Sequence, residues 1–472
     1  MKKISLSVFS FLALCILLCT ACSDDAQYKA DLSQIERTIY ITRDSLSNEL
    51  WLEVEKNEVI KLCLDSKVRT WETKLHSKNL NDSCLAFQVP TLIGVDTIKV
   101  YFSDDSSSHN INLAVGMKYL NFKNEEVLLG FNQFTEGFLE HGLCLTARGS
   151  IPCDPKNEDP ERLASVTGTY LVDKYPVTNC EIVQVMWDSL ATKNSIGYDE
   201  RKMIAEKWIN RKNHSIRNGN CITKDSAANS ITLFQAMKYA NARSLRENLK
   251  PVYIFSKTNE EKPLILSKGK YVIKDYDFLK FESESKLIFT ILVSVDESSD
   301  GYRLPYYDEW MIFARGGDKK NKTTWGDEAF FKYARFNSEI SFYDSEPVGQ
   351  LLPNGYGLYD MLGLVEEHVL FESSNPFERL KNRPSCSKGG DIKHNWRETT
   401  YGSIEADFYT IKKGGFRLIR NIGNNAKWSN DKVQKTEVKS NEKSYDFATI
   451  GKEPLKRITP QTDTTTQKRK QK

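Results

Sequence analysis

The chain has 472 residues, with 66 Lys and Arg against 63 Asp and Glu and a formal net charge of +3. Because charges of both signs are common, composition gives no reason to expect nucleic acid or another polyanion as a partner. The length is sufficient for two or three domains with a sizeable core, and no apolar run after the leader is long enough for a membrane-spanning helix.

Residues 1–21 are predicted to be a signal peptide. Two lysines precede an apolar run, residues 4–18, that is too short to remain in a bilayer as a helix. Small residues then lead to Cys22 and the chain becomes polar at once, which resembles a bacterial lipobox. We expect diacylglycerol on Cys22, with residues 22–27 as a tether to the membrane. The alternative is an ordinary secreted protein that is cleaved after Ala21.

Two neighbours of Cys22 bear on its destination. Ser23, rather than an aspartate, follows the cysteine, and this resembles sorting to the outer membrane more than retention in the inner one. Cys19 departs from the leucine that such signals usually carry. We therefore expect a secreted, lipid-anchored protein of the outer membrane, on either its periplasmic or its exposed face.

Seven cysteines follow the predicted lipidation site, in a compartment that we expect to be oxidising. Proximity in sequence makes Cys63–Cys84 and Cys144–Cys153 candidate disulfides, although spacing does not fix connectivity. An odd number leaves one thiol over, and Cys386 is the candidate. No cysteine pair has the spacing of a structural zinc site.

Residues 28–122 are predicted to form a small all-β module with a sandwich architecture. Short β-prone runs alternate here with turns rich in Ser, Asp and Asn. The clearest runs are Arg37–Thr42, Leu50–Glu55, Asp96–Phe102 and Ile111–Val115. Residues 123–141 are then expected to be a linker.

Isolated helices are predicted further along the chain. One spans Glu181–Ala191 and begins at a cap supplied by Thr178 or Asn179. Another spans Ser230–Asn248 and buries one face. That face comprises Leu233, Ala236, Met237, Ala240 and Leu245.

Motifs rich in glycine, proline and tryptophan follow one another across residues 142–421. In the motif Gly301–Gly317, Pro305 cannot continue a strand, Asp308 and Glu309 favour a helix N-terminus, and two glycines end that helix. The motifs are Gly168–Asn179, Gly301–Gly317, Trp325–Asp327, Pro347–Gly349, Pro353–Glu367, Lys388–Asp391 and Gly414–Arg420. Residues 422–472 are polar with a basic end, and we expect a solvated, disordered tail.

In this order the motifs resemble the formylglycine-generating-enzyme family, also called sulfatase-modifying factors. Members carry EVTN, GYRLPTEAEWE-AARGG, WG, PVG, NxxGLYDMxGNVWEW, RGGSW and GFR elements in the same succession. The resemblance implies an α+β domain with a C-type-lectin-like fold and many irregular loops. The family-motif positions are Asn179, Arg303, Glu309, Trp310, Trp325, Asn354, Asp360, Glu366, Gly390 and Arg417.

Most of these positions have a structural interpretation. We expect Arg303 and Arg417 to hold the fold through buried hydrogen bonds, with Asp360 and Glu309 as natural partners. Aromatic residues of the motifs are expected in the core rather than on a ligand surface. They are Trp310, Trp325 and Tyr359.

Departures from the family pattern indicate that catalysis is lost. The resemblance implies two cysteines between the RGGSW and GFR elements that bind copper, and thiolates are the ligands that copper(I) selects. This chain has no cysteine between Gly390 and Gly414. His394 lies there alone, and we interpret it as a loop residue. We therefore expect no catalytic residue and no formylglycine-generating activity.

The resemblance also implies calcium at the GNVWEW turn, which here is Gly363–His368. Leu364 supplies no side-chain oxygen, so that only Glu366 and backbone carbonyls remain to form a weak site. We therefore expect no cofactor. The run Glu366–Glu367–His368 is interpreted as partly solvated or salt-bridged, because adjacent side chains do not converge on one point.

Three functions from different classes remain open. We favour a non-catalytic envelope lipoprotein that uses the domain for binding or assembly of an envelope complex, because the resemblance extends to lipid-anchored components of gliding and secretion machinery. The second is a lipoprotein that binds carbohydrate or another surface ligand. The third is a divergent oxidoreductase. Residues 257–299 are an insertion relative to the compact family pattern, and we expect partner contacts there that deletion would abolish without unfolding the core.

Overall fold

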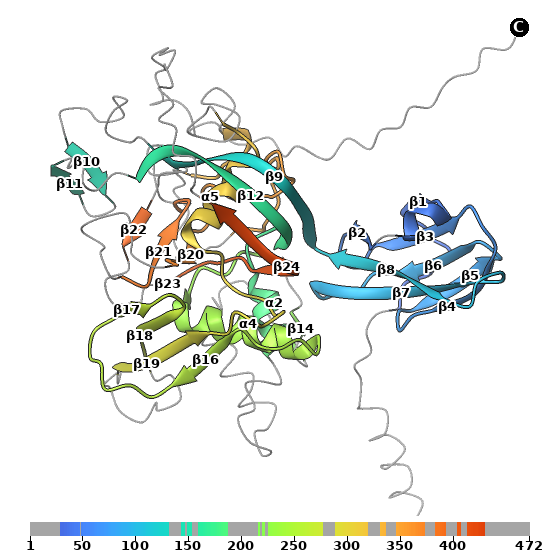
Figure 1. The fold of residues 1–472 in the computed structure, drawn as a ribbon, viewed down its shortest axis with the longest axis horizontal. Coiled ribbons are helices and arrows are strands. Elements are labelled where there is room, and N and C mark those ends of the chain that lie inside the picture. Colours follow the sequence, from blue (N-terminus) through green and yellow to red (C-terminus); the bar gives the residue numbers. More distant parts are fainter. Residues whose placement is uncertain are drawn as a thin grey trace, which may run out of the picture. The chain divides into compact units, whose positions relative to one another are not determined.

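The computed structural model describes residues 29–47, 49–131, 143–146, 149–152, 159–186, 216–217, 220–221, 225–276, 288–319, 331–336, 346–372, 383–392, 404–406 and 413–429. The chain divides into two compact units (Figure 1). The first consists of Met1–Thr91 and Asp96–Val115, and the second of Leu92–Val95 and Gly116–Lys472. In the described part of the chain, no helix is long and apolar enough to cross a membrane.

The first unit consists of two four-stranded sheets with a shared core. Their strand orders are β1-β3-β6-β5 and β2-β8-β7-β4. The elements are β1 (Arg37–Ile41), η1 (Arg43–Ser47), β2 (Leu50–Val54), β3 (Val59–Leu64), β4 (Val68–Glu72), β5 (Ser77–Asn81), β6 (Cys84–Gln88), β7 (Gly94–Phe102) and β8 (Ser108–Val115). All four runs predicted from sequence lie in strands, namely β1, β2, β7 and β8.

Alternation along the strands places the core between these sheets. Ile60 and Leu62 of β3 and Phe87 of β6 point inward and are completely buried. Cys63 and Cys84 lie opposite each other on the β3–β6 ladder and form a disulfide, which confirms the predicted pair.

The remaining cysteines have different outcomes. Cys386 is a buried thiol outside any disulfide, as predicted, whereas Cys180 is disulfide-bonded. Cys153 lies outside the described residues, so the Cys144–Cys153 pair stays a prediction.

A three-stranded antiparallel sheet of order β24-β12-β9 runs through the second unit (Figure 1). Its strands are β9 (Met117–Phe131), β12 (Asp159–Asp173) and β24 (Ile419–Ser429). The sequence-based linker at 123–141 therefore begins inside β9, and the sequence-based tail at 422–472 begins inside β24. Both strands were missed in the sequence because their segments include polar stretches. They form strands by pairing with β12, which is distant in sequence.

Helices α2 (Asn179–Met186), α4 (Leu233–Arg246) and α5 (Tyr307–Arg315) lie in the second unit. Thr178 caps the start of α2, because its hydroxyl accepts from the Glu181 N–H at 3.2 Å. Residues 187–191 of the longer predicted helix lie outside the described residues. α4 has a capping box, because Thr232 Oγ1 accepts from Gln235 N and Gln235 Oε1 accepts from Thr232 N.

The predicted inward face of α4 agrees with the structure except at its C-terminal end. Its first four predicted members are buried, but Leu245 is 62% exposed, so its predicted burial was wrong. The buried stripe continues through Arg243 and Ser244 instead. These residues follow Ala240 by three and four positions, which keeps them on its face, whereas a step of five turns Leu245 away.

The predicted insertion forms most of a four-stranded antiparallel sheet of order β16-β19-β18-β17. The strands are β16 (Tyr253–Ser256), β17 (Leu264–Ser267), β18 (Lys270–Tyr276) and β19 (Ile288–Val295). Tyr253, Tyr271 and Val293 are buried, and the Tyr271 hydroxyl donates to the Phe371 carbonyl at 2.8 Å. The insertion therefore contributes to the core, and its deletion would remove Tyr271 and Val293 and uncover Tyr253 on β16.

Short strands complete the second unit. They form the pairs β10–β11, β13–β14 and β15–β23 and the three-stranded sheet β20-β21-β22. Their bounds are β10 (Leu143–Thr146), β11 (Gly149–Pro152), β13 (Ile216–Arg217), β14 (Asn220–Cys221), β15 (Ile231–Thr232), β20 (Glu367–Leu370), β21 (Ser385–Lys388), β22 (Ile404–Ala406) and β23 (Lys413–Gly414). The unit is thus rich in strands, with few helices among the described residues.

Candidate functional site

Three of the sequence motifs meet around a small recess in the second unit. The recess is lined by Asn229, Leu364, Val365, Glu366, Asp391, Ile392, Lys413, Gly414 and Gly415. Backbone hydrogen bonds hold the motifs together, because Gly415 N donates to Glu366 O at 2.8 Å and Ile392 N donates to Leu364 O at 3.2 Å. Segments that are distant in sequence therefore form one continuous lining.

Glycine is required where these segments approach each other. A Cβ atom on Gly415 would lie 2.6 Å from Val365 Cγ2 and 2.8 Å from Ala228 O. A Cβ atom on Gly363, which has a φ of 76°, would lie 2.1 Å from Arg335 O. The GFR and GNVWEW-like motifs thus keep their glycines for a steric reason.

The polar lining of the recess consists of oxygen, amide and ammonium groups. Asn229, Glu366 and Asp391 are each no more than 8% exposed, while Lys413 lies exposed at the rim. These groups can donate and accept hydrogen bonds and balance charge. Among the lining residues there is no thiol, imidazole or aromatic ring.

The run Glu366–Glu367–His368 does not converge, as predicted. Glu366 lines the recess, whereas Glu367 bonds Arg417 in the interior. His368 Nε2 lies 2.9 Å from the Ile231 carbonyl and therefore donates to it. Of the two expected alternatives, the salt bridge is confirmed for Glu367, whereas partial solvation was wrong because all three residues are buried.

Behind the recess, Arg417 and Glu367 form a fully buried ion pair. Arg417 Nη2 and Nε donate to Glu367 at 2.7–2.9 Å, and Trp310 Nε1 donates to Glu367 Oε2 at 2.8 Å. Asp360 was expected to share the two motif arginines with Glu309, but its carboxylate accepts from Gly349 N at 2.7 Å. The partner of Arg417 is instead Glu367, which is the first residue of β20.

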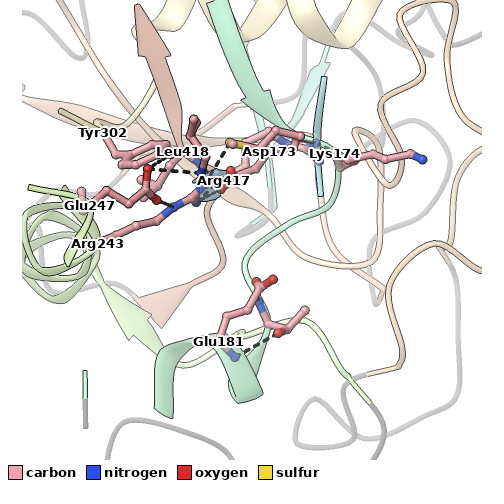
Figure 2. Close-up of polar contacts among 12 residues, drawn as sticks. Asp173, Lys174, Glu181, Arg243, Glu247, Tyr302, Arg417 and Leu418 are labelled. Atoms are coloured by element: carbon pink, nitrogen blue, oxygen red, sulfur yellow. Dashed lines mark hydrogen bonds and ion pairs between the residues drawn. The ribbon is translucent and has the colours of Figure 1, made fainter. Parts of the chain in front are cut away.

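A second buried pair, Arg243 and Asp173, lies beside Arg417 (Figure 2). Arg243 Nη1 donates to both oxygens of Asp173, at 2.8 and 3.0 Å, and Leu418 N donates to Asp173 Oδ2 at 3.0 Å. The Arg243 guanidinium also lies 3.9 Å from the centre of the Tyr302 ring. Sequence reasoning missed this pair, although an arginine on the apolar stripe of α4 was a usable signal.

Other motif residues hold α5 in place. Arg303 donates twice to Glu309 at 2.7 Å, which confirms one predicted pairing, and Glu309 also accepts from Tyr306 N at 2.9 Å. Asn354 Nδ2 donates to the last carbonyls of the helix, including Phe313 O at 2.7 Å. These contacts satisfy both ends of a short helix.

The remaining candidates have separate places. Asn179 is buried and its Nδ2 lies 3.4 Å from Ala227 O. Gly390 adopts a φ of 70°, which favours glycine. Trp310 is completely buried, as expected. Cys22 and Trp325 lie outside the described residues.

Lys388 is a buried residue that sequence reasoning missed. It alternates with Ser387 along β21, so that it shares a face with Cys386. Its Nζ lies 4.6 Å from the centre of the Tyr307 ring, and burial lowers the pKa of the amine to about 8. The side chains of Lys388 and Cys386 lie in the interior and do not line the recess.

The recess does not suit the metals that the resemblance implied. Copper(I) needs soft ligands, and the lining offers carboxylates, an amide and an ammonium group. At the calcium turn, Leu364 has a φ of 60° and its side chain packs with Ala227 and Val365. Its carbonyl already accepts from Ile392 N. In the described part of the chain, no group of three or more His, Cys, Asp and Glu residues is arranged to hold a metal.

The sulfatase-modifying factor enzyme 1-like domain matches residues 134–422, which is more than half of the chain. The chain belongs to this family. The chaperone protein LppX of Paenibacillus barcinonensis is 30% identical over 210 aligned residues, and the match covers 40% of this chain and 68% of that protein.

Two further comparisons differ in their coverage. The formylglycine-generating enzyme of Mus musculus is 32% identical over 111 residues, and the match covers 19% of this chain and only 30% of the enzyme. The solved structure of Treponema denticola variable protein 1 is 19% identical, with a TM-score of 0.39. That match covers 70% of this chain and 99% of the other.

Proposed function

We propose that the chain is a non-catalytic envelope lipoprotein whose sulfatase-modifying-factor domain binds a protein partner and helps to assemble an envelope complex. The chemistry of the recess carries this proposal, because its lining consists of Glu366, Asp391, Asn229 and Lys413 rather than a thiol pair. Cys386 is the last cysteine of the sequence and is completely buried in the interior. No thiolate is therefore available to hold copper on the segment between the last two motifs.

The same chemistry favours recognition over catalysis. Carboxylates and an ammonium group can recognise polar groups by hydrogen bonds and charge, but they do not carry electrons. A sugar-binding site commonly presents an aromatic ring for stacking, and the lining residues include none. Carbohydrate binding and a divergent oxidoreductase activity are therefore the alternatives, which a glycan array and metal analysis would detect.

The proposed anchor is the lipid on Cys22, with residues 1–21 as signal peptide and residues 22–27 as tether at the outer membrane. The lipobox-like sequence supports this anchor. We also propose that residues 142–421 are an α+β domain of C-type-lectin-like type. The packing of α4 and α5 beside short sheets is consistent with that arrangement.

Partner contacts are proposed on the exposed side chains of the insertion sheet. Ile254 on β16 is 53% exposed and Leu266 on β17 is 46% exposed, although both strands belong to a sheet that buries Tyr271. Because deletion of the insertion would remove Tyr271 from the core, substitutions at exposed positions are the better test.

The native lipoprotein would be pulled from its membrane and its partners identified by mass spectrometry. We expect the double variant Ile254→Ser and Leu266→Ser to lose the partner, and the control Leu245→Ser on α4 to keep it. Equal recovery from all three proteins would place the contact elsewhere. Absence of any partner from the wild-type protein would overturn the assembly role.

Metal and ligand assays test the non-catalytic part of the proposal. We expect purified protein to contain no stoichiometric copper or iron and to show the same Tm in calcium and in chelator. Stoichiometric copper or iron would overturn the proposal in favour of an oxidoreductase. Specific binding on a glycan array would favour the carbohydrate alternative.

A further inference from the structure

One sheet of the first unit has an outer face that is only partly covered. Core side chains of the sheet β1-β3-β6-β5 alternate with an outward set, because successive strand residues point to opposite faces. One outward ladder row is Tyr40, Cys63, Cys84 and Asn81, and the next is Thr38, Lys61, Ala86 and Lys78. Tyr40 is 78% exposed at the β1 edge of this face.

The segment just before β1 lies across part of the same face. Leu32 packs on Val59 and Ala86, which belong to the outward set. Ala30 N donates to the Gln88 side chain at 3.0 Å. The described chain therefore begins on the outer face of this sheet and not on the opposite sheet.

The length of the preceding chain limits how far this face lies from a lipid on Cys22. Lys29 follows Cys22 by seven residues, and an extended chain of that length spans at most about 25 Å. The second sheet of the sandwich is about 10 Å further away. A chain anchored at Cys22 therefore brings the face that carries Leu32 within reach of the bilayer.

We propose that this outer face rests on a phospholipid surface, an inference that depends on the proposed lipidation of Cys22. Tyr40 provides an amphipathic ring of the kind that enters the headgroup region. Lys61 and Lys78 lie in the neighbouring outward row. Their ammonium groups would contact lipid phosphates.

The test uses the full-length lipoprotein in phosphatidylethanolamine–phosphatidylglycerol vesicles, with a fluorophore on Thr38→Cys. A matched probe on Lys99→Cys reports the outer face of the other sheet, because Lys99 alternates with the core residues of β7. Nitroxide-labelled headgroups should quench the probe at position 38 and leave the probe at position 99 unaffected. Tyr40→Ser should weaken the quenching at position 38.

Each other result overturns the inference in a recognisable way. Equal quenching at both positions, with acyl groups confirmed by mass spectrometry, would leave the lipoprotein assignment intact and remove the docking face. A probe at position 38 that is immobilised without headgroup quenching would indicate a protein partner instead. A chain without acyl groups would overturn both the inference and the proposed anchor.

Discussion

Arg417 and Glu367 bond each other where neither side chain reaches water. An ion pair in such a place loses its hydration, and removal of one partner leaves a buried charge without its counter-ion. The contrast with an exposed pair such as Lys99–Glu72 is direct, because water already screens those charges. Burial rather than distance therefore decides what each pair contributes.

Arg417→Met is expected to lower the free energy of unfolding by about 3–5 kcal/mol. The double variant Arg417→Met and Glu367→Leu should recover part of that loss, because neither charge then remains. Lys99→Met is the control and should leave stability unchanged. Urea unfolding followed by tryptophan fluorescence measures all three, and equal effects of Arg417→Met and Lys99→Met would contradict the buried-pair interpretation.

Asp360 gives a prediction about pH. Burial raises the pKa of its carboxyl group to about 6, against the Gly349 N–H, which lowers it. Because the folded pKa lies above the unfolded value, this group stabilises the fold fully below about pH 4, and that contribution is lost as pH rises through 6. Asp360→Asn should therefore gain stability relative to wild type as pH rises from 4 to 7, on the order of 3 kcal/mol.

The amide introduced by Asp360→Asn would retain an oxygen acceptor for Gly349 N, and asparagine tolerates the φ of 53° at this position. The comparison thus isolates the charge. Guanidinium unfolding at several pH values is the measurement. Parallel stability curves for the two proteins would show that Asp360 does not titrate as the structure indicates.

At the residue scale, the sequence identifies which residues form buried contacts better than it identifies which residues pair with each other. Arg303 and Glu309 belong to one short motif, so their pairing was accessible. Arg417 had several candidate carboxylates at long range, and only the fold decides that Glu367 reaches it. The recess shows the same limit, because Lys413 and Asn229 meet there from segments that no local pattern relates.

At the element scale, the Thr232 side chain caps the beginning of α4. Thr232 is completely buried and its hydroxyl satisfies an N–H group of the first turn. Thr232→Val keeps the shape and removes the acceptor, so we expect a loss of about 1–2 kcal/mol of stability. Thr38→Val, at an exposed strand position, should have little effect in the same thermal unfolding experiment. Equal small changes for both would show that the cap is dispensable.

Elements were predicted well where their signals are local. A cap at Thr178 or Asn179 located the start of α2, and two glycines located the end of α5, because the groups that end a helix are adjacent to it in sequence. β9 was interpreted as a linker after residue 122, since its exposed stretch Lys123–Glu126 is polar on both faces. Only its antiparallel partner β12 makes that stretch a strand.

At the scale of the whole molecule, the Cys63–Cys84 disulfide lies within the first unit. It closes a loop with a sequence separation of 21, which corresponds to roughly 3 kcal/mol of stabilisation in the chain-entropy account. Replacement of both residues by alanine should lower the melting temperature of the first unit alone. Calorimetry of the full chain tests this, and an equal shift of every transition would contradict the division into two cooperative units.

Leu92–Val95 belongs to the second unit although its neighbours in sequence on both sides belong to the first. Val95 N donates to Glu247 Oε2 at 3.3 Å, and Gly94 leaves the room that the Glu247 carboxylate occupies. The gene therefore encodes the larger unit in two separated pieces. A fragment that starts at Gly116 would therefore lack a native contact of α4. If the N-terminal module were exchanged between relatives, residues 92–95 would have to come from the protein that supplies the second unit.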